Sequence, residues 1–150
     1  MTASYELELT MDEASDGTLS WMVTCPAFPE VTTFGDDQKE ACVHGLRAIE
    51  EAISARISDN EALPHPMKET NGKGAFVDVP ALTFLKSVLY MTCKDSDISR
   101  AELARRLGWH REQVDRLFRI DHKSQIDQME AAFKAIGVPL AFNIDFPIAA

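Results

Sequence analysis

Alternating hydrophobic and polar positions dominate the first third of the chain. Residues 5–11 alternate between apolar and mostly acidic side chains, which predicts a strand with one buried face. Asp16-Gly17 is a typical hairpin turn, a second alternating run covers residues 19–23, and a short strand is expected near residues 31–34. Asp36 or Asp37 can then cap a helix. The expected buried stripe of that helix is Cys42, Leu46, Ile49, Ile53 and Ile57.

Helical spacing dominates the second half, after a polar segment. Residues 59–74 are rich in Pro, Gly and Asn and are predicted to form a flexible loop, while residues 75–79 are a candidate fourth strand. Beyond Pro80 a helix is expected, and another is expected to be capped by Ser124 and to end near Gly137. The stripe predicted for the first of these helices is Leu82, Leu85, Val88 and Leu89. The stripe predicted for the second is Ile126, Met129, Phe133 and Ile136.

Residues 100–119 have the spacing of a helix-turn-helix. A small residue, Ala104, lies where a second helix must cross closely, and Gly108 lies where the turn needs a residue that tolerates positive φ. Ser99 and Glu102 form the pattern of a capping box at the start of the first helix. The apolar positions that would pack the two helices together are Leu103, Leu107, Trp109, Val114 and Leu117. A surface helical hairpin is the alternative, but all structural positions are filled at once.

Charge divides the chain into two unequal halves. Residues 1–75 hold 14 acidic and 5 basic side chains, which accounts for the whole net charge of −9, whereas residues 76–150 hold 10 of each. Residues 100–119 contain six Arg against three acidic residues. Such asymmetry predicts two modules with different partners, a domain over residues 1–80 and another over residues 81–150.

The second helix of the motif would present its exposed side chains to duplex DNA. Side chains at the start of such a helix reach base edges, where Arg pairs with guanine and Gln with adenine. The candidate DNA-binding residues are Arg100, Arg111, Glu112, Gln113, Arg116 and Arg119. Arg100 and Arg119 are better placed for phosphates. Glu112 and Asp115 would repel phosphates unless one of them accepts a hydrogen bond from a cytosine or pairs with Arg116 or Arg119. An ordinary solvated helical face is the competing interpretation.

Catalytic and metal-binding patterns are missing from the sequence. Glu6 and Glu8 would share one face of the first strand, as nuclease carboxylates do, but acidic side chains are also what a solvated strand face carries. The four His residues lack metal-ligand spacing, and no cofactor-binding motif is present. Three unclustered Cys residues fit free thiols in a reducing cytosol, and no apolar run reaches membrane-spanning length. We therefore expect a cytoplasmic protein that is not an enzyme, with no catalytic residue, metal or cofactor.

Taken together, these motifs resemble the HicB antitoxins of bacterial toxin–antitoxin pairs, in the branch that bears a helix-turn-helix. The resemblance covers about residues 5–146. In the first half it rests on Asp16-Gly17, residues 25–29 (CPAFP), residues 33–36 (TFGD), Glu40-Ala41 and residues 60–64 (NEALP). In the second half it rests on residues 102–108 (ELARRLG) and residues 116–118 (RLF).

The order of the predicted elements gives an α+β fold, in which a β-β-β-α-β domain precedes an all-α helix-turn-helix domain with a terminal β-strand. The resemblance implies that the first domain has a partial RNase H-like fold. It also implies that the first domain binds and blocks a small HicA ribonuclease toxin, and that the second represses the operon by binding operator DNA. The acidic first half fits a basic, RNA-binding partner independently. A ligand-responsive repressor with a sensing N-terminal domain and a nuclease using the strand carboxylates remain as alternatives.

The C-terminal residues are predicted to join two protomers. Four apolar residues alternate there: Leu140, Phe142, Ile144 and Phe146. A lone strand leaves its backbone groups unpaired, and the neighbouring elements in sequence are helical. We therefore expect a homodimer, or a higher homo-oligomer, through residues 139–146, whose twofold axis would suit paired DNA half-sites.

Overall fold

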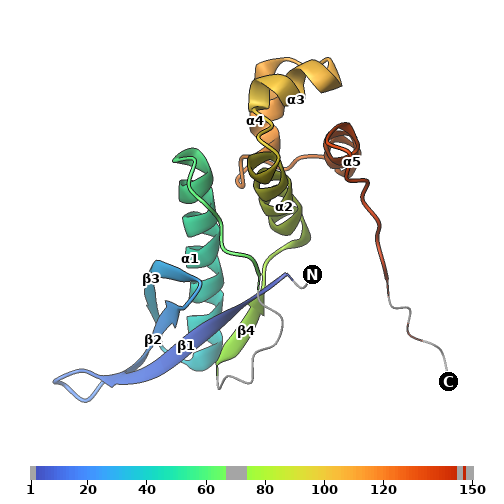
Figure 1. The fold of residues 1–150 in the computed structure, drawn as a ribbon. Coiled ribbons are helices and arrows are strands. Elements are labelled where there is room, and N and C mark those ends of the chain that lie inside the picture. The colour runs from blue at the N-terminus through green and yellow to red at the C-terminus, as the bar shows by residue number, and fades with distance from the viewer. Residues whose placement is uncertain (1–2, 67–73, 145–146, 148–150) are drawn as a thin grey trace.

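A four-stranded antiparallel sheet forms the first half of the chain in the computed structural model, which describes residues 3–66, 74–144 and 147. The strands lie in the order β3-β2-β1-β4, so that β1 pairs with both β2 and β4 (Figure 1). The strand expected at residues 75–79 is therefore confirmed as the fourth strand, antiparallel to the start of β1. Their bounds are β1 Ser4–Glu13, β2 Leu19–Cys25, β3 Phe28–Gly35 and β4 Ala75–Asp78.

One long helix, α1 (Gln38–Ser58), covers one face of this sheet. Of the two candidate caps, Asp37 is the N-cap, and it accepts a hydrogen bond of 2.8 Å from the backbone N–H of Glu40. A Cβ at Gly35 would lie 2.3 Å from the backbone nitrogen of Ala41, so only glycine lets the first turn of α1 approach β3 this closely. The predicted stripe is buried at Ile49, Ile53 and Ile57, and half-buried at Cys42 and Leu46. We call β1–β4 and α1 the sheet unit.

The rest of the described chain is helical, which makes the fold a mixed α+β one. Four helices, here called the helical unit, pack around buried apolar side chains such as Leu103, Val114 and Phe133. Gly137 follows the last helix with φ +80°, as expected, but Gln125 rather than Ser124 is the N-cap of that helix. No described helix is long and apolar enough to cross a membrane. The helices are α2 Ala81–Asp95, α3 Arg100–Leu107, α4 Arg111–Leu117 and α5 Ile126–Ala135.

The buried face of α2 differs from the predicted stripe. Leu89 is buried, but Leu82, Leu85 and Val88 are only half-buried. The most buried positions instead include three polar side chains: Thr83, Lys86 and Ser87. Hydrophobic periodicity failed here because α2 packs through polar groups whose hydrogen-bond partners lie on other elements or in its own preceding turn.

The first part of the predicted flexible loop is instead fixed between the two units. The hydroxyl of Tyr5 in β1 donates to the Pro64 carbonyl (3.0 Å), and the hydroxyl of Tyr90 in α2 donates to the Glu61 carbonyl (2.6 Å). Leu63 between them is buried. Residues 61–66 form a loop, as the composition predicted, but tyrosines far away in sequence anchor it through hydrogen bonds. Residues 67–73 of the predicted loop lie outside the described residues.

The expected C-terminal strand is not formed within the single chain. Residues 138–144 have no regular secondary structure, and residues 145 and 146, including Phe146, lie outside the described residues. Leu140 is half-buried, whereas Phe142 and Ile144 are 59% and 69% exposed. A strand requires a neighbouring strand for its backbone hydrogen bonds, and the described part of the helical unit contains none.

Candidate functional site

The α3–α4 pair has the local geometry that its spacing predicts. Ser99 caps α3 by accepting from the backbone N–H of Glu102 (3.1 Å), and Gly108 ends α3 with φ +67° in the left-handed region. Leu103 and Val114 are fully buried between the helices. At the start of α4, the backbone N–H of His110 donates to the side-chain oxygen of Gln113 (2.9 Å). Gln113 therefore stabilises the helix terminus in this state, and its side-chain oxygen is already engaged.

The six candidate DNA-binding residues gather on or beside α4. Arg111, Glu112, Gln113 and Arg116 occupy exposed positions of α4, and Arg119 is exposed just after it. Arg100 opens α3 and is half-buried, with its guanidinium 4.9 Å from the ring centre of Phe118. The structure thus places these residues on one end of the helical unit.

Most of these arginines are held by carboxylates. Asp115 accepts from both Arg100 (3.1 Å) and Arg111 (3.2 Å), and Arg119 pairs with Asp121 (2.8 Å). Partial burial raises the pKa of Asp115, but the hydrogen bonds from both arginines outweigh it and lower the pKa below its usual value. Asp115 was expected to repel phosphates unless it paired with Arg116 or Arg119. It instead pairs with Arg100 and Arg111, which offset its charge.

Arg116 is the exception on this surface. Its side chain is exposed, and no ion pair involving it is found among the described residues. Glu112 is also exposed and lies four positions earlier on α4, without an ion pair to Arg116 in the described structure. Arg116 is therefore the guanidinium of α4 that can bind a new partner without breaking an existing ion pair.

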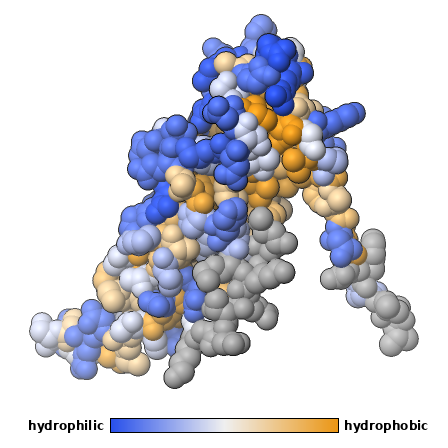
Figure 2. Space-filling view, viewed as in Figure 1, coloured by the Kyte–Doolittle hydropathy of each residue, from blue (hydrophilic) through white to orange (hydrophobic). Residues whose placement is uncertain are grey.

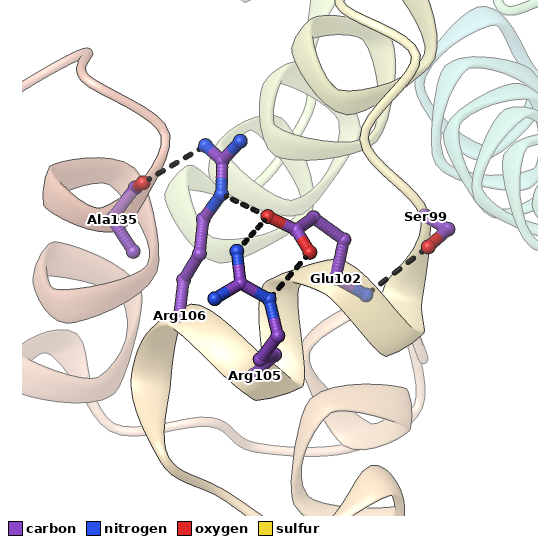
Figure 3. A network of polar contacts seen from close by, with 5 residues as sticks. All are labelled: Ser99, Glu102, Arg105, Arg106 and Ala135. Atoms are coloured by element: carbon purple, nitrogen blue, oxygen red, sulfur yellow. Dashed lines mark hydrogen bonds and ion pairs between the residues drawn. The ribbon is translucent and has the colours of Figure 1, made fainter.

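A second arginine cluster on α3 was missed in the sequence analysis (Figure 3). Glu102 accepts from Arg105 (2.6 Å) and from Arg106 (2.9 Å), and Arg106 also donates to the Ala135 carbonyl at the end of α5 (3.3 Å). These hydrogen bonds lower the pKa of Glu102 to about 2, although the carboxylate is solvent-exposed. The signal was present in the sequence as an i, i+3 and i, i+4 spacing, which places all three side chains on one face of α3.

Polar contacts join the sheet unit to the helical unit along α2. Thr83 donates to Glu50 of α1 (2.7 Å), and Lys94 donates to the Asn60 carbonyl (2.7 Å). An open cleft of about 620 Å³ lies along this seam. Its cations are already engaged, since Lys94 binds Asn60 while Arg100 and Arg111 share Asp115. The cleft thus lies between the two units and is not a pocket within the sheet unit.

The face of the sheet opposite α1 is open within the described structure. Alternate residues of β1 point to opposite faces, so Glu8 is exposed while its neighbour Leu7 is fully buried. Register places Met22 opposite Phe34 on the open face, and Phe34 is 47% exposed. This face, which we call the open sheet face, thus combines exposed apolar side chains with carboxylates.

Metal-dependent nuclease chemistry finds no support in the described residues. No group of three or more His, Cys, Asp or Glu side chains there could hold a metal ion. Cys25, Cys42 and Cys93 are all free thiols. Burial raises the pKa of Cys25 and raises that of Cys93 to about 11, which disfavours the reactive thiolate at both positions.

Comparisons with known proteins agree on one family. Residues 4–88 match the HicB-like antitoxin family of bacterial toxin–antitoxin systems. The chain is 32% identical over 145 residues to the antitoxin HicB of Pseudomonas fluorescens (strain Pf0-1), covering 97% of this chain and 99% of that protein. It is 32% identical over 133 residues to the antitoxin HicB of Escherichia coli (strain K12), covering 89% and 94%. It is 35% identical over 117 residues to antitoxin HicB 2 of Photorhabdus laumondii, covering 78% and 82%.

The arginine cluster on α3 generates a test of the predicted DNA surface. Glu102→Gln removes the carboxylate that neutralises Arg105 and Arg106, and should tighten binding of unrelated duplex DNA severalfold at low salt. The slope of log affinity against log salt should steepen by about one, because one more phosphate contact is gained. Filter binding at several salt concentrations measures both values. Glu130→Gln removes the same charge from an exposed position of α5, and an equal effect of both variants would contradict a specific role of the cluster.

Proposed function

This chain belongs to the HicB-like antitoxin family of bacterial toxin–antitoxin systems, and from that premise we propose that it is a cytoplasmic antitoxin with two activities. It binds and neutralises a HicA-type, mRNA-cleaving toxin, and it represses its own operon. The observation that carries this proposal is similarity over 97% of the chain to a protein named antitoxin HicB, which spans the sheet unit and the helical unit together.

The distribution of charge supports the sheet unit, within residues 1–80, as the toxin-binding domain. We interpret this domain as a partial RNase H-like domain. Residues 1–75 carry the entire net charge of −9. A ribonuclease must attract RNA phosphates and therefore presents basic residues, so an acidic partner binds it through complementary charge. We assign the contact to the open sheet face, where Glu8 and Asp12 of β1 are exposed and Phe34 of the edge strand β3 supplies apolar area.

The α3–α4 pair supports operator binding as a helix-turn-helix, within a domain over residues 81–150. In such motifs the second helix reads base edges in the major groove while the start of the first helix contacts the backbone. Arg116 lies on the exposed face of α4 without an ion pair among the described residues, which suits base contact. Arg100, at the first position of α3, suits a phosphate.

The alternatives receive less support. A nuclease would need a cluster of metal ligands, and the described residues hold none. A ligand-sensing repressor would need a pocket in the sheet unit. The hollow beside His44 and Arg47 of α1 there has about 310 Å³, half the volume of the cleft along the seam, whose cations are already engaged. We therefore propose that the protein is a binding protein rather than an enzyme, working without metal or cofactor.

The C-terminal segment supports a homodimer or a higher homo-oligomer. Phe142 and Ile144 are exposed, and Ile126 of α5 is 51% exposed. Leu82 and Leu85 of α2 are half-buried, and Figure 2 shows hydrophobic residues gathered on the helical unit over α2 towards α5. Exposed apolar surface of this kind marks interaction sites. Pairing of the segment with its copy in a second protomer would cover these side chains and satisfy the backbone.

Two arginine variants test operator binding. Arg116→Ala should cost about 1–3 kcal/mol of binding free energy and relax the preference at one base position. Arg100→Ala should instead weaken binding to all sequences and reduce the salt slope by about one. Electrophoretic mobility shifts with the DNA upstream of the gene, and with base-substituted copies, measure both effects. Arg47→Ala removes the same charge from an exposed position of α1, and operator affinities equal to this control in both variants would refute the assignment.

Charge reversal on the sheet unit tests toxin binding. Glu8→Lys on the open sheet face should slow association with a basic HicA-type toxin by about tenfold at low salt, because steering charge is lost. The difference should shrink as salt rises. Glu51→Lys makes the same change on the exposed face of α1. Stopped-flow association rates distinguish the two faces, and slowing by Glu51→Lys alone would place the toxin on α1 instead.

Truncation tests the oligomer. A chain that ends after Gly137 lacks residues 138–150 and should sediment as a monomer in analytical ultracentrifugation. It should also lose affinity for an operator with two half-sites, while toxin binding by the sheet unit persists. A truncated chain that still dimerises and binds its operator normally would show that the segment is only a tail.

A further inference from the structure

Lys86 of α2 is a buried cation without a carboxylate partner in hydrogen-bond contact. Its side chain has no solvent exposure, and it is the only charged residue among the buried ones in the described part of the chain. Removing an ammonium from water costs several kcal/mol unless its protons are bound elsewhere, so such a position requires an explanation.

Three backbone carbonyls supply the missing solvation. The Nζ of Lys86 donates to the carbonyl oxygens of Arg119 (2.6 Å), His122 (2.7 Å) and Arg116 (3.0 Å). An ammonium has three donors and no acceptor, so all its protons are used. Burial lowers the pKa of Lys86 to about 8, while Asp121 nearby opposes this shift. The ammonium form that donates all three protons therefore predominates at neutral pH.

The position of these carbonyls relates Lys86 to α4. Arg116 lies in the last turn of α4, and Arg119 and His122 lie in the segment that follows. Carbonyls at a helix C-terminus lack partners within the helix, and a cation there meets the negative end of the helix dipole. With only seven residues, α4 is far below the length at which an isolated helix is stable in water. Contacts from other helices must therefore hold it.

Two other helices hold the C-terminal half of α4. Arg100 of α3 binds Asp115, and Lys86 of α2 binds the Arg116 carbonyl and two carbonyls of the segment that follows. The residues whose backbone Lys86 fixes, Arg116 and Arg119, are two of the residues proposed to contact DNA. Their side chains stay exposed, whereas Lys86 itself is inaccessible to DNA.

We propose that Lys86 is a positioning residue for operator recognition, which fixes the C-terminal end of α4 so that Arg116 reads one base position. The inference rests on the proposed operator binding and deepens it. Affinity for DNA of any sequence depends on the number of exposed cations, which Lys86 does not change. Preference for the operator depends on where the reading side chains lie, and a small displacement of a positioned group is enough to lose it. Loss of Lys86 should thus reduce sequence preference and leave general DNA binding in place.

The experiment compares Lys86→Met with Lys134→Met in the full chain. Methionine keeps the apolar stem and removes the three donors, and Lys134 is an exposed residue of α5 that controls for loss of one positive charge. Both are titrated with the DNA directly upstream of the gene and with an unrelated duplex of equal length. Lys86→Met should reduce the ratio of the two affinities by tenfold or more, with affinity and salt slope for the unrelated duplex within twofold of wild type. Lys134→Met should keep the wild-type ratio.

A measurement on the wild-type protein tests the inference even if the Lys86→Met variant fails to fold. In ¹⁵N-labelled protein, the buried ammonium of Lys86 should give a slowly exchanging signal that shifts with operator DNA and stays unchanged with the unrelated duplex. A signal indifferent to the operator, or a folded Lys86→Met variant with the wild-type affinity ratio, would overturn the inference. If the wild-type chain itself shows no preference for the upstream DNA, the proposed operator binding fails instead, which is a separate result.

Discussion

The polar inner face of α2 is the constraint on which both units depend. Thr83 binds Glu50 of α1, Tyr90 binds the Glu61 carbonyl, and Lys86 holds the end of α4. Each of these groups would be costly to bury without its partner, whereas apolar side chains pack acceptably in many arrangements. The hydrophobic core supplies most of the stability of such a chain, but hydrogen bonds of fixed direction select one arrangement of the helices. The relative placement of the sheet unit, α2 and α4 thus follows from a few polar contacts on one helix.

Neighbouring carboxylates partly neutralise the positive charge of the helical unit. Glu102 engages two arginines, Asp115 engages two more and Asp121 engages Arg119, which leaves Arg116 without an ion pair among the described residues. Exposed ion pairs contribute little to folding stability, about 0–1 kcal/mol each, so their main consequence is electrostatic. These ion pairs weaken the attraction of the helical unit to phosphates, which lowers its affinity for DNA of any sequence. They have less effect on a base contact made by Arg116. In the proposed function, this arrangement favours discrimination between sequences over raw affinity for DNA.

Sequence reasoning succeeded where the determinants are local. The caps by Asp37 and Ser99, the left-handed turn at Gly108 and the alternation of β1 all depend on residues a few positions apart. The fourth strand was also predicted, although its partner β1 lies far away in sequence. The prediction came from the short run of apolar residues before Pro80. Local patterns also located the α3–α4 pair and most of the arginines on it.

It failed where a polar side chain finds its partner far along the chain. Lys86 was not part of the predicted apolar stripe of α2, because hydrophobic periodicity counts apolar side chains, and its acceptors lie 30 to 36 positions away. The anchoring of residues 60–66 was missed for the same reason, since Tyr5 and Tyr90 come from either side of that segment. The ion pair between Arg100 and Asp115 was missed because the two residues belong to different helices. Backbone carbonyls carry no signature in the sequence, so donors aimed at them are invisible to pattern analysis.

The anchored segment changes how two partners could bind one chain. A flexible linker would let the sheet unit and the helical unit bind their partners independently, as tethered modules do. Here the Tyr90 ring also meets Phe118 edge-on at 6.4 Å, and Phe118 carries the Arg100 guanidinium at 4.9 Å. The loop at Glu61 and an arginine proposed to bind DNA are therefore separated by two aromatic rings in contact. Contact of this kind fixes position without by itself transmitting a signal. Its consequence is geometric: a toxin held on the open sheet face would occupy a defined place relative to the operator, set by α2.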